Sequence, residues 1–197
     1  MVNNIILLRD NLRRAQQEAI SGYTLRSRPD ALLEKLCKNV DQTLQQIWKQ
    51  SEIPSDIALI AVGGYGRGQL FPSSDIDVLV LLPAVSPAEL PEQVAALIGH
   101  MWDIGLEVGH SVRTAEECLQ EAAADITIET NLLENRLIAG AATPYQQLIQ
   151  RLDCRHVDRV DIGPLLAVDL DAHEVVIQNL ADAFVLEALM RHDVAPV

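Results

Sequence analysis

The spacing of apolar residues along this 197-residue chain changes between a helical and a strand-like pattern. In residues 3–20 and 30–50, apolar side chains recur every three or four positions, which is the spacing of a helix with one buried face. Residues 57–62 and 75–82 are instead short, nearly continuous apolar runs, which are typical of buried strands. The pattern therefore predicts a mixed fold of helices and strands.

Further elements follow along the chain. The remaining helices are expected near residues 87–103, 115–124, 126–139, 144–152, 163–169 and 171–191. A third strand is expected at 106–113, and Thr114 and Asp125 are each placed to begin a helix, because their side-chain oxygens can accept hydrogen bonds from backbone N–H groups. We expect three parts: an N-terminal helix in 1–28, a mixed α/β core in 29–124 and a helical subdomain in 125–197.

Composition and charge narrow the class of protein. Hydrophobic residues make up 49% and charged residues 22%, as in an ordinary soluble domain. No run of eighteen apolar residues occurs and the N-terminus lacks the features of a signal peptide, so we expect a cytoplasmic protein with no membrane contact. The net charge of −13, from 15 basic and 28 acidic residues, argues against a nucleic-acid partner, because phosphate-backbone binding depends on clustered Lys and Arg.

Two carboxylates stand at the start of the strand expected at 75–82. Side chains alternate across a strand, so Asp75 and Asp77 point to the same face. Like charges this close raise each other's pKa unless a cation lies between them. Mg²⁺ prefers carboxylate oxygens and commonly shares itself with phosphate oxygens. The pair therefore predicts a metal site suited to phosphoryl chemistry.

A glycine pair, Gly63 and Gly64, follows the strand expected at 57–62. Without side chains the backbone can approach a ligand, and amide groups at such a turn can bind phosphate oxygens. A plain loop is the alternative for the glycines taken alone. A dinucleotide fingerprint would need glycine where Gln69 stands, and a P-loop lysine is excluded because no lysine follows Lys49.

Two further side chains lie near these motifs. Arg67, between the two strands, can contact a triphosphate or a leaving pyrophosphate through its planar guanidinium, or it can pair with an acidic residue. Ser74 can donate a hydrogen bond to phosphate or orient Asp75, although capping of a local turn explains it nearly as well. Arg113 is the other nearby cation, and we expect it on the strand face opposite Glu107.

Residues 63–77 read Gly-Gly-Tyr-Gly-Arg-Gly-x-Leu-x-Pro-x-Ser-Asp-Ile-Asp, and this string resembles the signature of the DNA polymerase β-type nucleotidyltransferase superfamily. It looks most like the branch of bacterial PII uridylyltransferase/uridylyl-removing enzymes. Residues 102–114, Trp-Asp-Ile-Gly-Leu-Glu-Val-Gly-His-Ser-Val-Arg-Thr, are also similar to that branch. The resemblance implies an α+β fold of the polymerase β type, with a small mixed sheet flanked by helices and followed by a helical subdomain.

The resemblance also implies a third carboxylate on a neighbouring strand. Glu107 is the best candidate, while Gly109 occupies what corresponds to the position where relatives place an aspartate. Asp125 and Glu129 are later acidic alternatives that fit better as helix-start charges.

The implied activity is transfer of UMP from UTP to a tyrosine hydroxyl of the PII nitrogen-regulatory protein, with release of pyrophosphate, by in-line displacement with two Mg²⁺ ions as cofactor. Asp75, Asp77 and Glu107 would be catalytic, with the two aspartates as metal ligands. A related protein adenylyltransferase and a catalytically silent nucleotide-binding module stay open as alternatives. The family's hydrolase and regulatory domains are not in this sequence, so we expect the chain to correspond to an N-terminal piece of such an enzyme.

Overall fold

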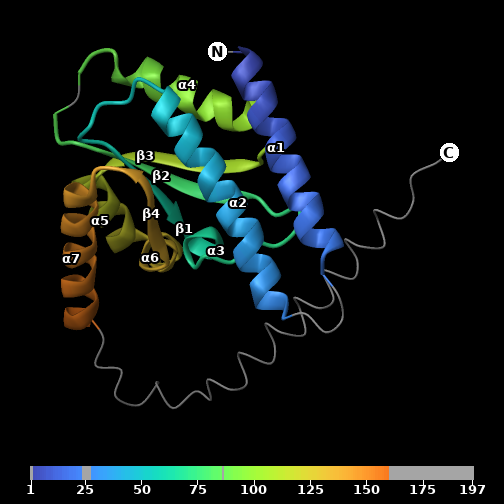
Figure 1. Ribbon diagram of the computed structural model, residues 1–197. Coiled ribbons are helices and arrows are strands. Elements are labelled where there is room, and N and C mark those ends of the chain that lie inside the picture. The colour runs from blue at the N-terminus through green and yellow to red at the C-terminus, as the bar shows by residue number, and fades with distance from the viewer. Residues whose placement is uncertain (1, 24–27, 86, 160–197) are drawn as a thin grey trace.

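The computed structural model describes residues 2–23, 28–85 and 87–159. These residues form a mixed β-sheet with helices on both faces (Figure 1). Its elements in chain order are α1 (Val2–Ser21), α2 (Pro29–Gln50), β1 (Ala58–Val62), α3 (Gly63–Gly66), β2 (Ile76–Leu82), α4 (Leu90–Asp103), β3 (Val108–Thr114), α5 (Ala115–Ala124), α6 (Ile126–Leu133), β4 (Asn135–Gly140) and α7 (Ala142–Arg159). The expected α+β class, with a small mixed sheet flanked by helices, is confirmed. None of the described helices is long and apolar enough to cross a bilayer.

The strand order is β3-β2-β1-β4. Strand β1 runs antiparallel to both β2 and β4, whereas β2 and β3 are parallel and are connected through α4, as a parallel pair requires. The register places Val62, the last residue of β1, opposite Asp77, and it places Asp77 opposite Gly109 of β3. The end of β1 and the starts of β2 and β3 therefore lie side by side at Asp77.

Alternate side chains of β2 pack into two hydrophobic cores, one on each face of the sheet. Ile76, Val78 and Val80 pack on the side of α1, α2 and α4, and Leu79 and Leu81 pack with residues of α5, α6 and α7. These β2 side chains are almost completely buried. Alternation puts Asp77 on the same face as Leu79, but at the end of the strand where the carboxylate reaches solvent.

The helix starts follow the expected capping chemistry. The Thr114 hydroxyl accepts a hydrogen bond from the Glu117 N–H, and the Glu117 carboxylate accepts one from the Thr114 N–H at 2.8 Å, which completes a capping box for α5. The Asp125 carboxylate accepts a hydrogen bond from the Thr127 N–H at 2.7 Å and begins α6. Both predicted caps are confirmed.

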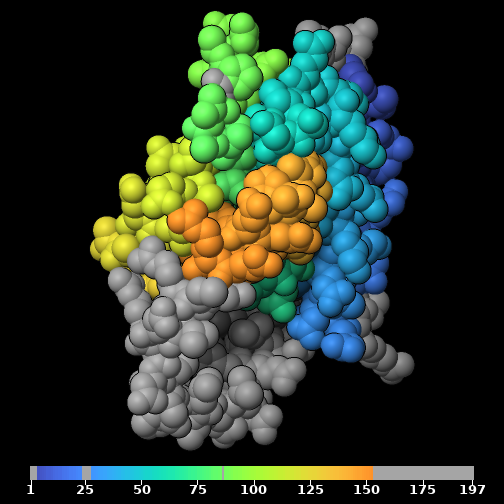
Figure 2. Space-filling model, turned by 90° about the vertical axis from the view of Figure 1, so that its left-hand side faces the viewer, coloured from blue at the N-terminus to red at the C-terminus, as the bar shows by residue number. Residues whose placement is uncertain are grey.

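The helix expected at 126–139 is wrong in its second half. Residues Asn135–Gly140 form β4, an edge strand that pairs with β1. A short apolar run is compatible with a helix or with a strand. Here its pairing with β1 favours the strand. In the space-filling view this segment, in orange, lies between α2, in blue, and α5, in yellow (Figure 2). The sheet thus continues beyond residue 124, and the helices expected at 163–169 and 171–191 lie outside the described residues.

Gly66 allows α3 to lie directly against the residue that precedes β4. A Cβ at this position would lie closer than 3.0 Å to the backbone carbonyl oxygen of Glu134, a contact that real Cβ atoms do not make. Gly99, within α4, has no atom within 4 Å of the equivalent position. The two glycines therefore differ in the space around them and make a matched pair for substitution.

We predict that Gly66→Ala lowers the free energy of unfolding by about 1–3 kcal/mol, the usual cost of overpacking. Gly99→Ala should instead raise it by about 0.5–1 kcal/mol, because alanine is the better helix former. Urea denaturation of both variants beside the parent chain measures the two effects. A Gly66→Ala variant as stable as the parent would show that Glu134 need not lie so close to α3.

Candidate active site

The Asp77 carboxylate lies between two glycines that come from different strands. A Cβ at Gly63 would lie 3.8 Å from Asp77 Oδ2, and a Cβ at Gly109 would collide with Asp77 Oδ1. Gly109 thus leaves room that the carboxylate occupies. The carboxylate is held where the ends of β1, β2 and β3 come together.

Asp75 precedes Asp77 by two residues and lies directly before Ile76, the first residue of β2. Partial burial raises the pKa of Asp77, and the negative charge of Asp75 raises it further. The pair thus forms a site of unneutralised negative potential. Such a site suits a divalent cation.

The donor set at this place is small. No group of three or more His, Cys, Asp or Glu side chains suited to a metal ion occurs within the described ranges. Two neighbouring carboxylates fit an ion such as Mg²⁺ that takes its remaining ligands from water and substrate phosphates. Asp75 and Asp77 are the residues that would hold it.

The glycine pair forms a helical turn rather than an open loop. Val62 is extended, Gly63 has a φ of +59°, and residues Gly63–Gly66 form α3. Only glycine adopts such a backbone without strain. The first N–H groups of a helical turn have no partners within it, and here they lie at the end of β1 beside Asp77.

Arg67 lies next to this turn and is also paired. Its Nη1 atom is 2.5 Å from the Glu134 carboxylate, the acidic pairing foreseen as the alternative role. Its Nη2 atom lies 3.6 Å from the place a Cβ would take at Gly64. The guanidinium therefore lies beside the glycine turn while Glu134 fixes one of its edges.

Ser74 closes the turn that leads into β2. Its backbone N–H and its hydroxyl both donate hydrogen bonds to the Phe71 carbonyl oxygen, at 3.2 and 3.1 Å. Ser73 has a φ of +63°, which is the left-handed region that the third residue of this kind of turn requires. The local capping role considered for Ser74 is present, and Asp75 follows directly from this turn.

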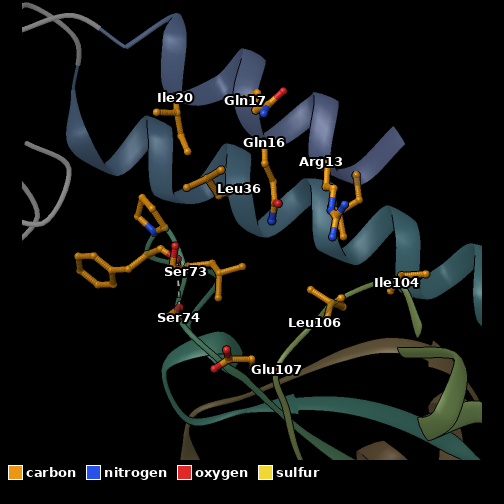
Figure 3. Close-up of a pocket in the computed structure, with 15 residues that line it drawn as sticks. Arg13, Gln16, Gln17, Ile20, Leu36, Ser73, Ser74, Ile104, Leu106 and Glu107 are labelled. Atoms are coloured by element: carbon orange, nitrogen blue, oxygen red, sulfur yellow. Dashed lines mark hydrogen bonds between the residues drawn. The ribbon is translucent and has the colours of Figure 1, made fainter. Parts of the chain in front are cut away.

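Glu107 lies alongside Asp75. The Ile76 N–H donates a 2.9 Å hydrogen bond to the Glu107 carbonyl oxygen, which places the residue before β3 beside the start of β2. Glu107 and Ser74 also line a cleft of about 490 Å³ between α1 and the sheet (Figure 3). Of the later alternatives, Asp125 caps α6, and the hydrogen bond from the Thr127 N–H lowers its pKa.

The face expected for Arg113 is wrong. Residues 107 and 113 are six apart, so a period of two places them on the same face of β3. Arg113 lines a cavity of about 180 Å³ together with Asp77 and Asn131, and its Nη2 atom lies 3.9 Å from Glu121. Arg113 is therefore a cation on the side of Asp77.

A polar network that the sequence did not reveal supports the glycine turn. The Asp41 carboxylate, on α2, accepts hydrogen bonds from Arg136 Nη1 at 2.6 Å and Nη2 at 3.1 Å, and from the Tyr65 hydroxyl at 2.6 Å. Arg136 Nη2 also donates to the Tyr65 carbonyl oxygen at 3.3 Å. Burial, and then the Asp41 charge, raise the pKa of Tyr65 well above its usual value. Three elements, α2, α3 and β4, are joined in this way.

A small mixed sheet, a glycine-started helical turn and an aspartate pair define the class of a nucleotidyltransferase. The family profile described as nucleotidyltransferase domain matches residues 37–134, and the chain therefore carries a domain of this family.

The chain is similar to curated proteins named bifunctional uridylyltransferase/uridylyl-removing enzyme. It is 53% identical over 147 residues to the one from Chromobacterium violaceum, 45% over 144 residues to that from Cupriavidus metallidurans and 46% over 154 residues to that from Bordetella parapertussis. These matches cover 75%, 73% and 78% of this chain and 17% of each relative, so the chain spans about a sixth of their length. The resemblance read from residues 63–77 and 102–114 is confirmed.

Among solved structures, one described as the crystal structure of the toxin-antitoxin with AMP-PNP covers 60% of this chain and 87% of its own. Its TM-score of 0.34 and identity of 15% are too low to support a conclusion.

The network predicts unequal effects of two tyrosine substitutions. The Tyr65 hydroxyl donates to a carboxylate, whereas the Tyr145 hydroxyl donates to the neutral Asn135 side chain at 2.7 Å. We expect Tyr65→Phe to cost about 1.5–3 kcal/mol of unfolding free energy and Tyr145→Phe about 0.5–1.5 kcal/mol. Guanidinium denaturation of the two variants makes the comparison. Equal losses would mean that the Asp41 charge adds nothing to the Tyr65 hydrogen bond.

The raised pKa of Asp77 predicts that its charge opposes folding. The folded state binds this proton more tightly than the unfolded state, so the cost is present above the folded-state pKa and disappears as pH falls below the ordinary value of 3.8. We expect Asp77→Asn to raise the melting temperature at pH 7 without divalent ions, by an amount that corresponds to at most about 1 kcal/mol for an exposed pair. Melting curves from pH 7 to pH 3 should show the difference shrink. A variant less stable than the parent at pH 7 would contradict this.

Proposed function

We propose that this chain transfers UMP from UTP to a tyrosine hydroxyl of a PII protein. The observation that carries the proposal is the Asp77 carboxylate beside Gly63 and Gly109, with Asp75 two residues away, in a chain about half identical to enzymes named uridylyltransferases. A paired carboxylate site next to a helical turn is the arrangement that nucleotidyl transfer needs. The relatives' names supply the uridylyl group, and PII as acceptor comes from the family resemblance.

The site residues have three roles: they bind the metal ion, bind the phosphates and accept the proton. Asp75 and Asp77 hold Mg²⁺, which when bound neutralises charge on the phosphates and lowers the barrier to attack. The amide groups at Gly63 and Gly64, with Arg67 beside them, bind the β- and γ-phosphates. Ser74 keeps the turn before Asp75 in place through its hydrogen bonds to Phe71.

The chemical step exchanges one phosphorus–oxygen bond for another. The phenolic oxygen of the acceptor forms a bond to the α-phosphorus, and the bond from the α-phosphorus to the bridging oxygen breaks, so that pyrophosphate leaves with its electron pair. Glu107, whose carbonyl oxygen accepts the hydrogen bond from the Ile76 N–H, accepts the phenolic proton on its carboxylate. Attacking and leaving oxygens lie on opposite sides of the phosphorus.

A catalytically silent nucleotide-binding module is the second candidate. It is favoured by the two-carboxylate donor set found within the described ranges and by the Glu134 carboxylate that already holds Arg67. Such a module would bind UTP through the glycine turn without transferring it.

The test is transfer of label from radiolabelled UTP to PII with Mg²⁺, comparing the parent chain with the Asp75→Asn/Asp77→Asn double variant. We expect the double variant to lose at least about 100-fold in rate, because it loses the ligands of the ion that stabilises the transition state. Equal labelling by both proteins would refute the assigned site. Tight UTP binding without transfer by the parent would favour the silent module, and labelling from ATP instead of UTP would favour an adenylyltransferase.

Gly109→Ala provides a variant that keeps both carboxylates but takes the space of Asp77 Oδ1. It should lose transfer nearly as completely as the double variant while its melting temperature stays close to that of the parent. Gly99→Ala, far from the aspartates on α4, serves as the matched control and should transfer at the parent rate.

A further inference from the structure

An asparagine from α6 lies at the glycine turn, on the side of Asp77. The place that a Cβ would take at Gly63 is 3.3 Å from Asn131 Oδ1 and 3.8 Å from Asp77 Oδ2. The Asn131 carboxamide and the Asp77 carboxylate therefore lie against the same residue of the turn. Both side chains also line the cavity of about 180 Å³ on this face of the sheet, so Asn131 borders open space as well.

The packing of α6 holds this asparagine in place. Helix α6 lies beside α3 (Figure 1). Its Leu132 is buried in the same hydrophobic core as Val62, the residue that ends β1 and precedes the glycine turn. Asn131 is the exposed neighbour of Leu132, and it lies within residues 37–134, the domain that this chain shares with its family. Its position near the turn is thus determined by the apolar contact of the next residue.

The Asn131 side chain has no hydrogen bond to any residue that the structure describes. In this it differs from Asn135, whose carboxamide donates to the Leu132 carbonyl oxygen at 2.9 Å and accepts from the Tyr145 hydroxyl at 2.7 Å. A free carboxamide has an unused donor and an unused acceptor. Rotation about its terminal torsion exchanges the two atoms, so Asn131 can present Nδ2 as well as Oδ1 to the turn.

The glycine turn depends on other elements for its side-chain donors. Residues 63–64 are glycines, and no lysine follows Lys49. The Arg67 guanidinium lies beside the turn, but Glu134 already binds one of its edges. Asn131 is free and uncharged, so it can donate to a phosphate without competing with a metal ion for the aspartates.

We propose that Asn131 is a nucleotide-binding residue, whose Nδ2 donates a hydrogen bond to a phosphate oxygen of the triphosphate tail at the glycine turn. The inference deepens the proposed function and rests on it, because that function assigns the β- and γ-phosphates to the same turn. The bond forms with UTP and is absent with UMP, which lacks those two phosphates. Asn131 is therefore a residue that selects a nucleoside triphosphate over a monophosphate.

Calorimetric titrations of UTP and of UMP in the presence of Mg²⁺ test this selectivity. Asn131→Ala should raise the Kd for UTP about 10-fold, the loss of one hydrogen bond to a charged group, and should leave the Kd for UMP unchanged. Its melting temperature without nucleotide should equal that of the parent, because no hydrogen bond within the described residues is lost. Thr130→Ala is the matched control, since the Thr130 hydroxyl donates to the Ile126 carbonyl oxygen at 2.8 Å, and it should bind both nucleotides as the parent does.

Asn131→Asp separates phosphate binding from metal binding. A carboxylate at this position repels the phosphates, so UTP should bind more weakly than to Asn131→Ala, whereas the affinity for Mg²⁺ alone should not fall, because a third negative charge lies near the aspartates. UTP binding by Asn131→Asp as tight as that of the parent, or a loss of Mg²⁺ affinity in Asn131→Ala, would identify Asn131 as a metal ligand and overturn the inference.

Two further outcomes of the titrations overturn it: a parent-like Kd for UTP in Asn131→Ala, or an equal rise in its Kd for UMP. The inference and the proposed function can fail separately. A parent chain that binds UTP but labels no PII refutes the proposed transfer, and the UTP titrations still decide the role of Asn131. A parent chain that binds no UTP refutes both.

Discussion

The position of the glycine turn depends on one carboxylate. Asp41 receives two hydrogen bonds from the Arg136 guanidinium and one from the Tyr65 hydroxyl, while Arg136 also binds the Tyr65 carbonyl oxygen. The Tyr65 ring lies 5.4 Å from the guanidinium carbon and is buried, while Asp41 and Arg136 are partly buried. Because Tyr65 is the third residue of α3, the backbone that faces Asp77 cannot shift without breaking several of these bonds. The network stabilises the glycine turn, and its hydrogen bonds do not include Asp75 or Asp77.

Much of the site could be predicted because its geometry is local. A spacing of two residues is enough to bring the charge of Asp75 close to Asp77, and side-chain capping is enough to start α5 at Thr114. The network could not be predicted in the same way, since Asp41 and Arg136 are 95 residues apart and only the assembled sheet brings them together. Strand β4 was missed for a related reason: pairing with β1, not its own sequence, determines its conformation.

The aspartate pair combines a stability cost with a binding capacity. Asp77 is held partly buried next to a like charge, which opposes its ionisation, and Gly109 provides the space that lets the carboxylate stay there. A site built for stability alone would place a larger, neutral side chain at one of these positions. The same features that make two neighbouring negative charges unfavourable make the binding of a divalent ion favourable, because neutralisation of the charges relieves the repulsion.

The family profile covers the groups around the aspartate pair but does not cover helix α1. On one side lie the glycine turn and Arg67, all within the shared domain, and these groups suit a phosphate chain whatever base it carries. Helix α1 precedes the profile match and packs on the domain through an apolar face that includes Leu8 and Leu12. Hydrophobic packing is tolerant of what the exposed face of the same helix presents. A helix held in this way can change its exposed residues without disturbing the core that supports β2.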